Sequence, residues 1–296
     1  MDDIKCCSRC DSSCGCGGLS ALICTEGEKT MTQQEEVTFR LSVREFFFLT
    51  NMLGIHYIAG FKDPFRGYLV EELEEEYEAV KRGLVERGFL RVIEGQKDSF
   101  EMDELLGVCL TTCGSNEAVY VNKRIKQEGD YEAFLYFTPN LVVERTWDEL
   151  EGETVLAPVA SAELSLNLLA KFFPLTLKGA VSFHANLPDM REVNWALLSM
   201  EEKQQLLLDK RVDPERVNYF VSLEKKAERR GSMVYWTRAG SYWEQEEYHY
   251  LQKGQDMLMI TKPGGHELRI ETYNPAVILK SLEKLAEKFD LVNKGA

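Results

Sequence analysis

Cysteine is the residue type whose spacing most suggests chemistry in this sequence of 296 residues. Six of the eight cysteines lie within the first 24 residues, where Cys7-x-x-Cys10 and Cys14-x-Cys16 have spacings that zinc accepts. They stand among serines and glycines, without an apolar segment that would fold around a metal. We therefore predict no metal site here.

The same stretch lacks the features of a targeting segment. Its apolar run, Leu19–Cys24, is too short for the core of a signal peptide, and no basic region of useful size precedes it. We expect residues 1–34 to be a flexible cysteine-rich leader, or a misassigned one ahead of a start at Met31.

The other chemically capable residues do not form a recognisable catalytic set. Cys109 and Cys113 lie four residues apart on the apolar side of a predicted helix, which is typical of buried, inert thiols. The four histidines, His56, His184, His249 and His266, have no metal-chelating spacing, and no hydrolase or phosphate-loop motif occurs. We predict no catalytic residue and no cofactor. An enzyme that uses Cys109, His184 or His266 in a pocket between two halves is an alternative without a supporting motif.

Charge excludes further classes of function. With 35 Lys and Arg against 49 Asp and Glu, the net charge of −14 opposes binding to nucleic-acid phosphates. The acidic run Glu71–Glu76 lies along a helix, without the loop geometry that calcium needs, so it predicts a solvated surface. Lys225-Lys226 and Arg229-Arg230 close another predicted helix, where cations complement the helix dipole. Contact with an acidic partner is the alternative for this basic cluster.

Two features bear on the cellular compartment. No apolar run approaches the roughly 18 residues that a membrane-spanning helix needs, so we expect no membrane insertion. The body of the chain lacks the spread of cysteines that a secreted disulfide fold would show, which favours a reducing compartment, the cytoplasm.

Hydrophobic periodicity indicates helices, then a run of strands, then one closing helix, and this order occurs twice. The predicted helices cover about 42–53, 70–87, 103–114 and 161–173, and then 190–198, 200–210, 214–229 and 275–289. The predicted strands cover 89–93, 118–122, 131–137 and 141–147, and then 232–238, 242–251, 257–261 and 267–273.

The turns support an internal duplication. Gly129-Asp130 and Pro139-Asn140 in the first half correspond to Gly254–Asp256 and Pro263-Gly264 in the second. We therefore predict an α+β fold of two related halves, 35–175 and 176–296. Each half would have helices before an antiparallel sheet and a closing helix, and the second would carry a partner-binding sheet.

The aromatic residues of the second half suggest where that partner would bind. Six of them fall between 235 and 250, interleaved with glutamates, a composition favoured at protein–protein contacts. Strand alternation places Trp243 and His249 on one face of the sheet and Tyr242 and Tyr250 on the other. We predict that Trp236, Tyr242, Trp243 and Tyr250 bind a partner. The alternative is that these aromatics pack beneath the closing helix.

Several segments resemble the EspG-type substrate chaperones of type VII (ESX) secretion systems. Leu41–Gly54 resembles the opening helix of that family, Glu74–Leu90 with its Arg87-Gly88 turn is similar to the second helix, and Asp103–Leu106 fits the next one. The resemblance extends over about residues 40–290 and includes the family's pseudo-twofold, two-part layout. The cysteine-rich leader has no counterpart in the family.

The resemblance implies a function without bond chemistry. Proteins of this family are cytosolic, have no catalytic residues, and hold helical-hairpin export substrates in solution. It therefore implies a cytoplasmic chaperone or adaptor that binds a secreted helical protein or heterodimer. The main alternative is a winged-helix transcriptional regulator, because three helices precede strands between residues 41 and 137. A recognition helix rich in Arg and Lys is absent from that stretch.

Overall fold

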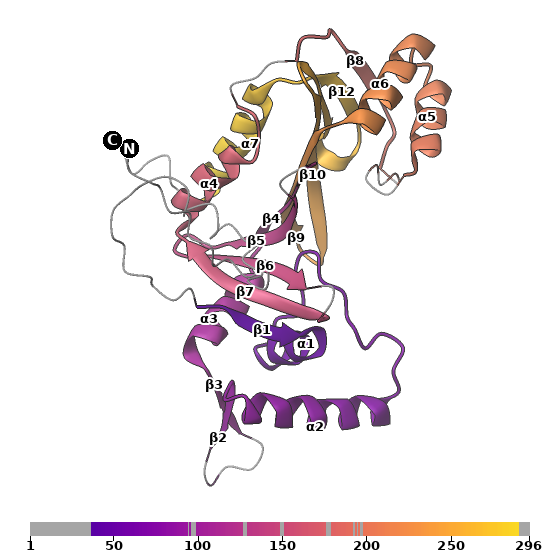
Figure 1. The fold of residues 1–296 in the computed structure, drawn as a ribbon. Coiled ribbons are helices and arrows are strands. Elements are labelled where there is room, and N and C mark those ends of the chain that lie inside the picture. Colours follow the sequence, from indigo (N-terminus) through magenta and orange to yellow (C-terminus); the bar gives the residue numbers. More distant parts are fainter. Residues whose placement is uncertain are drawn as a thin grey trace, which may run out of the picture.

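The centre of the molecule is a ten-stranded antiparallel sheet (Figure 1). This computed structural model describes residues 37–289, apart from 94, 96–98, 127–128, 149–150, 176–178, 192, 194 and 196–197. The strand order is β1-β7-β6-β5-β4-β9-β10-β11-β12-β8. The first five strands of the sheet are β1 (Phe39–Ser42), β7 (Glu153–Ala160), β6 (Val142–Asp148), β5 (Gly129–Phe137) and β4 (Glu117–Ile125). The other five are β9 (Arg229–Ala239), β10 (Tyr242–Lys253), β11 (Asp256–Lys262), β12 (Leu268–Thr272) and β8 (His184–Leu187).

Helices and one small hairpin surround this sheet. The helices are α1 (Val43–Met52), α2 (Val70–Glu86), α3 (Glu104–Cys113), α4 (Ala162–Lys171), α5 (Met200–Asp209), α6 (Pro214–Lys226) and α7 (Pro275–Lys288). The hairpin pairs β2 (Leu90–Val92) with β3 (Phe100–Met102) beside α2, and a short 3-10 turn, η3 (Pro263–Gly265), follows β11. The prediction of an α+β fold with antiparallel strands is confirmed, and the strands of both predicted halves belong to one sheet.

Polar side chains cap the first turn of several helices. Ser42 and Glu45 form a complete capping box at α1, and Asp103 accepts the Leu106 N–H at the start of α3. Asp213 caps α6 ahead of Pro214. Such caps satisfy backbone donors that the first helical turn leaves free.

The structure corrects some boundaries. The predicted helix at 190–198 is not among the helices of the described residues. There, the Met190 N–H donates to the His266 carbonyl and the Lys262 Nζ to the Val193 carbonyl, so contacts to the sheet hold this stretch. Strands β1, β7 and β8 were not predicted, and α6 ends at Lys226, before the strand residues Arg229 and Arg230.

The two faces of the sheet are covered differently. One face, which we call the closing-helix face, packs against α4 and α7 through a single core that crosses both halves of the sheet. The other, which we call the open face, has two separate cores. One lies beneath α1–α3 over β4–β7, and the other lies beneath α5 and α6 over β10–β12. The two helical groups on the open face sit at opposite ends of the molecule (Figure 1).

An arginine closes each outer edge of the sheet. The Arg87 guanidinium, just after α2, donates to the Arg40 carbonyl of β1. Arg216 of α6 donates to the His184 carbonyl of β8 at 2.8 Å. A sheet edge with free carbonyls is a template for pairing with another chain, and both contacts occupy part of that edge.

Arg145 of β6 organises the first core. Its side chain is 5% exposed, and it donates from Nε to the Tyr136 hydroxyl at 2.8 Å and from Nη2 to the Gly60 carbonyl at 3.0 Å. Its guanidinium also lies over the rings of Phe46, Phe61, Phe134, Tyr136 and Trp147 at 5.2–5.8 Å. These contacts hold the loop of residues 53–69 against the sheet.

Gly60 makes the close approach of that loop possible. It has a φ of +65°, and a Cβ atom here would lie 1.8 Å from Phe134 Cζ. No residue with a side chain fits without moving the buried Phe134 ring.

A buried ion pair joins the two helices of the second group. Lys203 Nζ of α5 lies 2.7 Å from Glu224 Oε1 of α6, with side chains 11% and 8% exposed. The ammonium also lies 5.5 Å from the centre of the Trp195 ring. Burial strengthens such a pair, but it also makes the loss of either partner costly.

Candidate functional site

A strip of half-buried side chains crosses the middle of the open face. Their positions follow from strand register, which places Tyr120 opposite Val234, Asn122 opposite Ser232, and Ser232 opposite His249. We call this set the central strip: Tyr120, Asn122, Ser232, Val234, Trp236, Trp243, Gln245 and His249. It lies on β4, β9 and β10, between the cores beneath α1–α3 and α5–α6, and its Tyr120, Trp236 and Trp243 pack against the first of them.

Two tryptophans form one border of the central strip. The Trp236 and Trp243 rings meet edge to face with centroids 6.1 Å apart, and Trp236 packs on Phe134 at 5.9 Å. Next to Trp243 in the strand pair, Arg238 lies over the Tyr57 ring at 4.4 Å, so the loop of residues 53–69 adjoins this border. Large, rigid aromatic surfaces of this kind lose little entropy on binding another protein.

The structure separates the four aromatic residues predicted to bind a partner. Trp236 and Trp243 lie together in the central strip. Tyr242 is 61% exposed at the end of β10, but its position alternates toward the closing-helix face. Tyr250 is 2% exposed and packs on Phe173 and Tyr273 in the core of that face. In the free chain Tyr250 is therefore a core residue, which matches the alternative that some of these aromatics pack beneath the closing helix.

A polar cluster occupies the other border of the central strip. His249 Nδ1 lies 2.8 Å from Ser232 Oγ, and His249 Nε2 lies 3.0 Å from Glu247 Oε2. Lys262 Nζ, from β11, lies 3.7 Å from Glu247 Oε1 and donates to the Val193 carbonyl at 2.8 Å. Burial alone would raise the pKa of Glu247, but the hydrogen bond from His249 and the charges of His249 and Lys262 outweigh it, so its pKa lies below the ordinary value.

Serine, histidine and carboxylate in this order resemble the parts of a nucleophilic site. Such a site also needs free N–H donors aimed at the developing oxyanion. Ser232, Glu247 and His249 lie within continuous ladders, where β10 pairs with both β9 and β11. The arrangement is therefore suited to holding strands β9–β11 and the 190–198 stretch together, and not to acyl transfer.

The charge of Glu247 gives a pH prediction. We expect Glu247→Gln to lower the free energy of unfolding by about 1–3 kcal/mol at pH 7, because buried Lys262 loses its anionic partner. Since the folded pKa of Glu247 lies below its ordinary value of 4.5, the stabilisation is present above that pH and is lost as the pH falls through the folded pKa. Urea unfolding of both proteins at pH 7 and pH 3.5 should show the difference shrinking at the lower pH. A constant difference would contradict the assignment.

The two cysteines of the body are buried and unpaired. Burial is the main reason that the pKa of Cys109 rises to about 11, and it raises the pKa of Cys113 further still. Both remain thiols at neutral pH, as predicted, so neither is an activated nucleophile.

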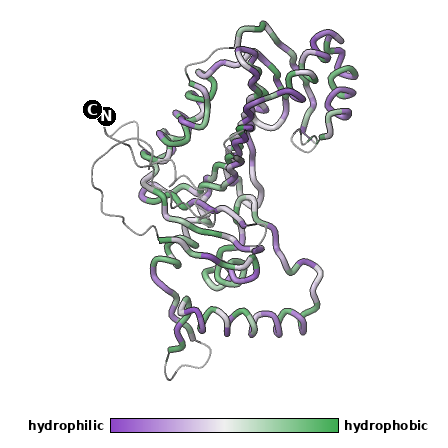
Figure 2. Tube along the Cα trace, in the orientation of Figure 1, coloured by the Kyte–Doolittle hydropathy of each residue, from purple (hydrophilic) through white to green (hydrophobic). Residues whose placement is uncertain are grey.

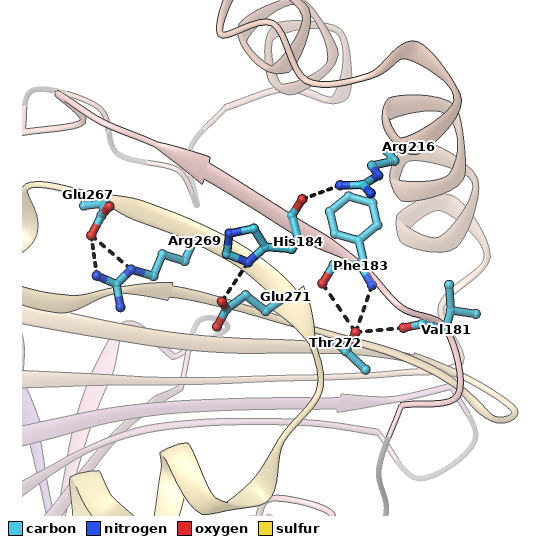
Figure 3. A network of polar contacts seen from close by, with 8 residues as sticks. All are labelled: Val181, Phe183, His184, Arg216, Glu267, Arg269, Glu271 and Thr272. Carbon is cyan, nitrogen blue, oxygen red and sulfur yellow. Dashed lines mark hydrogen bonds and ion pairs between the residues drawn. The ribbon is translucent and has the colours of Figure 1, made fainter.

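His184 is a surface residue at the β8 edge. Figure 3 shows its ring turned toward Glu271, with Nδ1 3.0 Å from Oε1, while Arg216 reaches its carbonyl. Beside it, the Thr272 hydroxyl accepts from the Phe183 N–H at 2.9 Å and donates to the Val181 carbonyl at 2.8 Å. These contacts fasten β8 to β12. His266 is exposed in the turn after β11, and Cys109 lies in a different core, so the structure does not bring these three residues together.

The charged patterns have structural roles. The acidic run lies on the first turns of α2, where Glu72 caps the Leu69 N–H and Arg44 pairs with Glu76. At the other cluster, Arg230 donates to the Glu224 carbonyl at the end of α6, as expected for a cation at a helix C-terminus.

The winged-helix alternative does not fit the strand arrangement. The strands that follow α3 are β4 and β5, which are inner members of the ten-stranded sheet, with β4 paired to β9. A winged helix instead has a short hairpin beside its recognition helix.

Residues that the sequence did not single out complete the central strip. Tyr120, Asn122, Ser232 and Val234 share a face with the tryptophans only because β4 pairs with β9. Alternation along 118–122 and 232–238 identifies a face within each strand, but nothing in the sequence pairs these strands.

Two further searches concern metals and membranes. Within the described residues, no group of three or more His, Cys, Asp or Glu is placed to hold a metal ion. Nor is any helix there long and apolar enough to cross a membrane. The six N-terminal cysteines and the predicted leader lie outside the described residues, so the structure does not test them.

Comparison with known proteins gives one kind of match. No protein-family model and no curated protein matches the sequence. Among solved structures, the chain is similar to the Mycobacterium tuberculosis type VII secretion chaperone EspG5, solved in complex with the PE25–PPE41 dimer. The match has a TM-score of 0.48 and 10% sequence identity, and it covers 83% of this chain and 95% of that one.

Proposed function

We propose that this protein is a non-enzymatic cytoplasmic chaperone or adaptor that holds a helical-hairpin secretion substrate of a type VII-like system. The observation that carries the proposal is the central strip, a half-buried mixed aromatic and polar surface between two separate helical groups. The resemblance of the sequence to EspG-type chaperones indicates the class of partner, a secreted helical protein or heterodimer.

The shape of the open face suits such a partner. The helical groups at its two ends leave a surface across three strands, bordered by Trp236 and Trp243 on one side and His249 on the other. The tip of a helical hairpin would place its apolar residues on the tryptophans and its polar edge on Asn122 and Gln245. Binding would keep those apolar residues from water and so prevent aggregation of the substrate.

We infer that the halves 35–175 and 176–296 derive from one duplicated unit. From either edge inward, the sheet has the same order. The edge strand is the earliest of its half in the chain (β1 or β8), the next four strands follow in reverse chain order, and β4 and β9 pair at the centre. In addition, α4 and α7 pack in one core, and an arginine closes each outer edge. On this reading the central strip lies where the two units meet.

A charge placed in the strip tests the function. We expect Gln245→Lys to weaken partner binding at least tenfold, because the bound partner would remove the charge at this half-buried position from water. Tagged protein co-expressed with a candidate helical-hairpin substrate would be purified, and the affinity of the complex measured by titration. Trp243→Ala should weaken binding as well, through lost aromatic contact.

Glu244→Lys is the matched control. Glu244 is the neighbour of Gln245 on β10, is exposed, and alternates to the opposite face. The variant Glu244→Lys changes the net charge by more than Gln245→Lys does. A nonspecific effect of charge on binding would therefore be larger in Glu244→Lys. Substrate capture by Gln245→Lys at the level of the unmodified protein would overturn the proposal.

A further inference from the structure

Helix α3 is apolar around most of its circumference. One side, with Leu106, Cys109, Leu110 and Cys113, is buried in the core beneath α1–α3. The opposite side also carries apolar residues, Leu105 at 38% and Val108 at 46% exposure. Figure 2 shows the contrast with the more hydrophilic α2. A helix that is apolar on all sides is normally covered on all sides.

The exposed side of α3 borders an open groove of about 340 Å³. Leu53, from the end of α1, and Met102, from β3, form its walls, and α3 contributes Asp103, Glu104, Gly107, Val108, Thr111 and Thr112. Most of the groove surface is apolar. It is separate from the central strip, since none of its lining residues belongs to that set.

Gly107 leaves the floor of the groove open. Glycine inside a helix is less stable than alanine, so its presence requires a reason. Sterics do not supply one, because a Cβ atom at this position would meet only Met102 Sδ, at an ordinary contact distance of 3.6 Å. The backbone at Gly107 therefore offers space for a side chain that comes from outside the helix.

The charge of the groove selects among occupants. Its only charged lining residues are Asp103 and Glu104, and it has no Lys or Arg. A second copy of the chain would bring the same acidic groove and a net charge of −14 against it, which disfavours self-association through this face. A basic segment would instead be attracted.

We propose that this groove binds an amphipathic, basic helix of a partner protein. One aliphatic side chain of that helix lies over Gly107, between Leu53 and Val108, and a Lys or Arg lies beside Asp103 and Glu104. This is the helix-in-groove mode of recognition. This contact does not depend on the proposed chaperone surface, because the groove and the central strip share no residue.

Fluorescence anisotropy on the full chain tests the pairing of shape and charge. The probe is a labelled 18-residue helical peptide with leucines on one face and lysines beside them. Two comparison peptides replace the lysines by glutamate or the leucines by serine. We expect the lysine–leucine peptide to bind at least tenfold more tightly than either. Equal binding of the glutamate peptide or the serine peptide would overturn the proposal.

Variants locate the binding. Glu104→Lys should weaken the lysine–leucine peptide at least fivefold, whereas Glu163→Lys, the same change in the first turn of the equally long α4, should not. Gly107→Leu should fill the groove and weaken binding at least tenfold, with circular dichroism checking the fold. If Gly107→Leu does not fold, the two charge variants decide. Equal effects of Glu104→Lys and Glu163→Lys would mean nonspecific attraction and would overturn the site.

A photo-crosslinking residue at Thr111, which is exposed on the groove, identifies the occupant. Crosslinking to a leucine of the peptide supports the proposal. Crosslinking that persists to residues 1–36 of the same chain, or to a second copy, in the presence of excess peptide would overturn it.

Discussion

Replacing Arg145 by alanine is expected to lower the free energy of unfolding by about 3–5 kcal/mol. The change removes hydrogen bonds to the Tyr136 hydroxyl and the Gly60 carbonyl, together with a cation surrounded by aromatic rings. The Gly60 carbonyl would be left without this donor, and a cavity would form in the core. Urea denaturation followed by circular dichroism measures the loss.

Two further variants sharpen this test. Arg145→Lys should recover less than half of the loss, because an ammonium cannot reproduce the planar fork or stack on the rings. Arg124→Ala is the control, since Arg124 pairs with Asp130 at 2.7 Å but is 61% exposed, and such pairs contribute about 0–1 kcal/mol. A loss below about 1 kcal/mol for Arg145→Ala would mean that the aromatic loop contacts hold without the cation.

The second large effect is expected at the α5–α6 ion pair. Glu224→Ala should lower the free energy of unfolding by about 3–5 kcal/mol, because it leaves the Lys203 ammonium buried without its anion. The double substitution Lys203→Met with Glu224→Leu should recover to within about 1 kcal/mol of the unmodified protein, since a buried ion pair is often no more stable than apolar residues of similar volume.

Urea denaturation of Lys203→Met, of Glu224→Leu and of the double variant completes this cycle. Glu224 Oε2 is buried and accepts no hydrogen bond from the described residues, which also favours apolar replacement. Additive losses in the double variant would show that the two side chains act independently, contrary to the prediction.

The sequence predicted local structure better than it predicted contacts between distant segments. The predicted helix starts at about 42, 103 and 214 agree with the structure, because the caps Ser42, Asp103 and Asp213 bond only to neighbours in the chain. The strands β1 and β8 were missed because each is only four residues long and is stabilised by a partner far away in the sequence. Residues 190–198 have a helical periodicity of apolar residues, but Val193 is held by a contact from outside the stretch, the hydrogen bond from Lys262 to its carbonyl.

The candidate site shows the same division. Alternation along β10 correctly separated Trp243 from Tyr242 and Tyr250, since a strand's two faces follow from its own residues. Alternation did not show which face of β10 is buried. Tyr250 is in the core because Phe173 and Tyr273, which lie far from it in the sequence or beyond the next strands, pack on its ring. Nor did it join Trp236 to Tyr120, which depends on the β4–β9 pairing.

The β4–β9 pairing also bears on the order in which the sheet folds. Within each meander, neighbouring strands are joined by short turns, so they can pair while the rest of the chain is still extended. Strands β4 and β9 are separated by more than a hundred residues, so their pairing closes a long loop. We therefore expect the surface on which we propose that a partner rests to be completed late in folding, after the strands of each meander have paired.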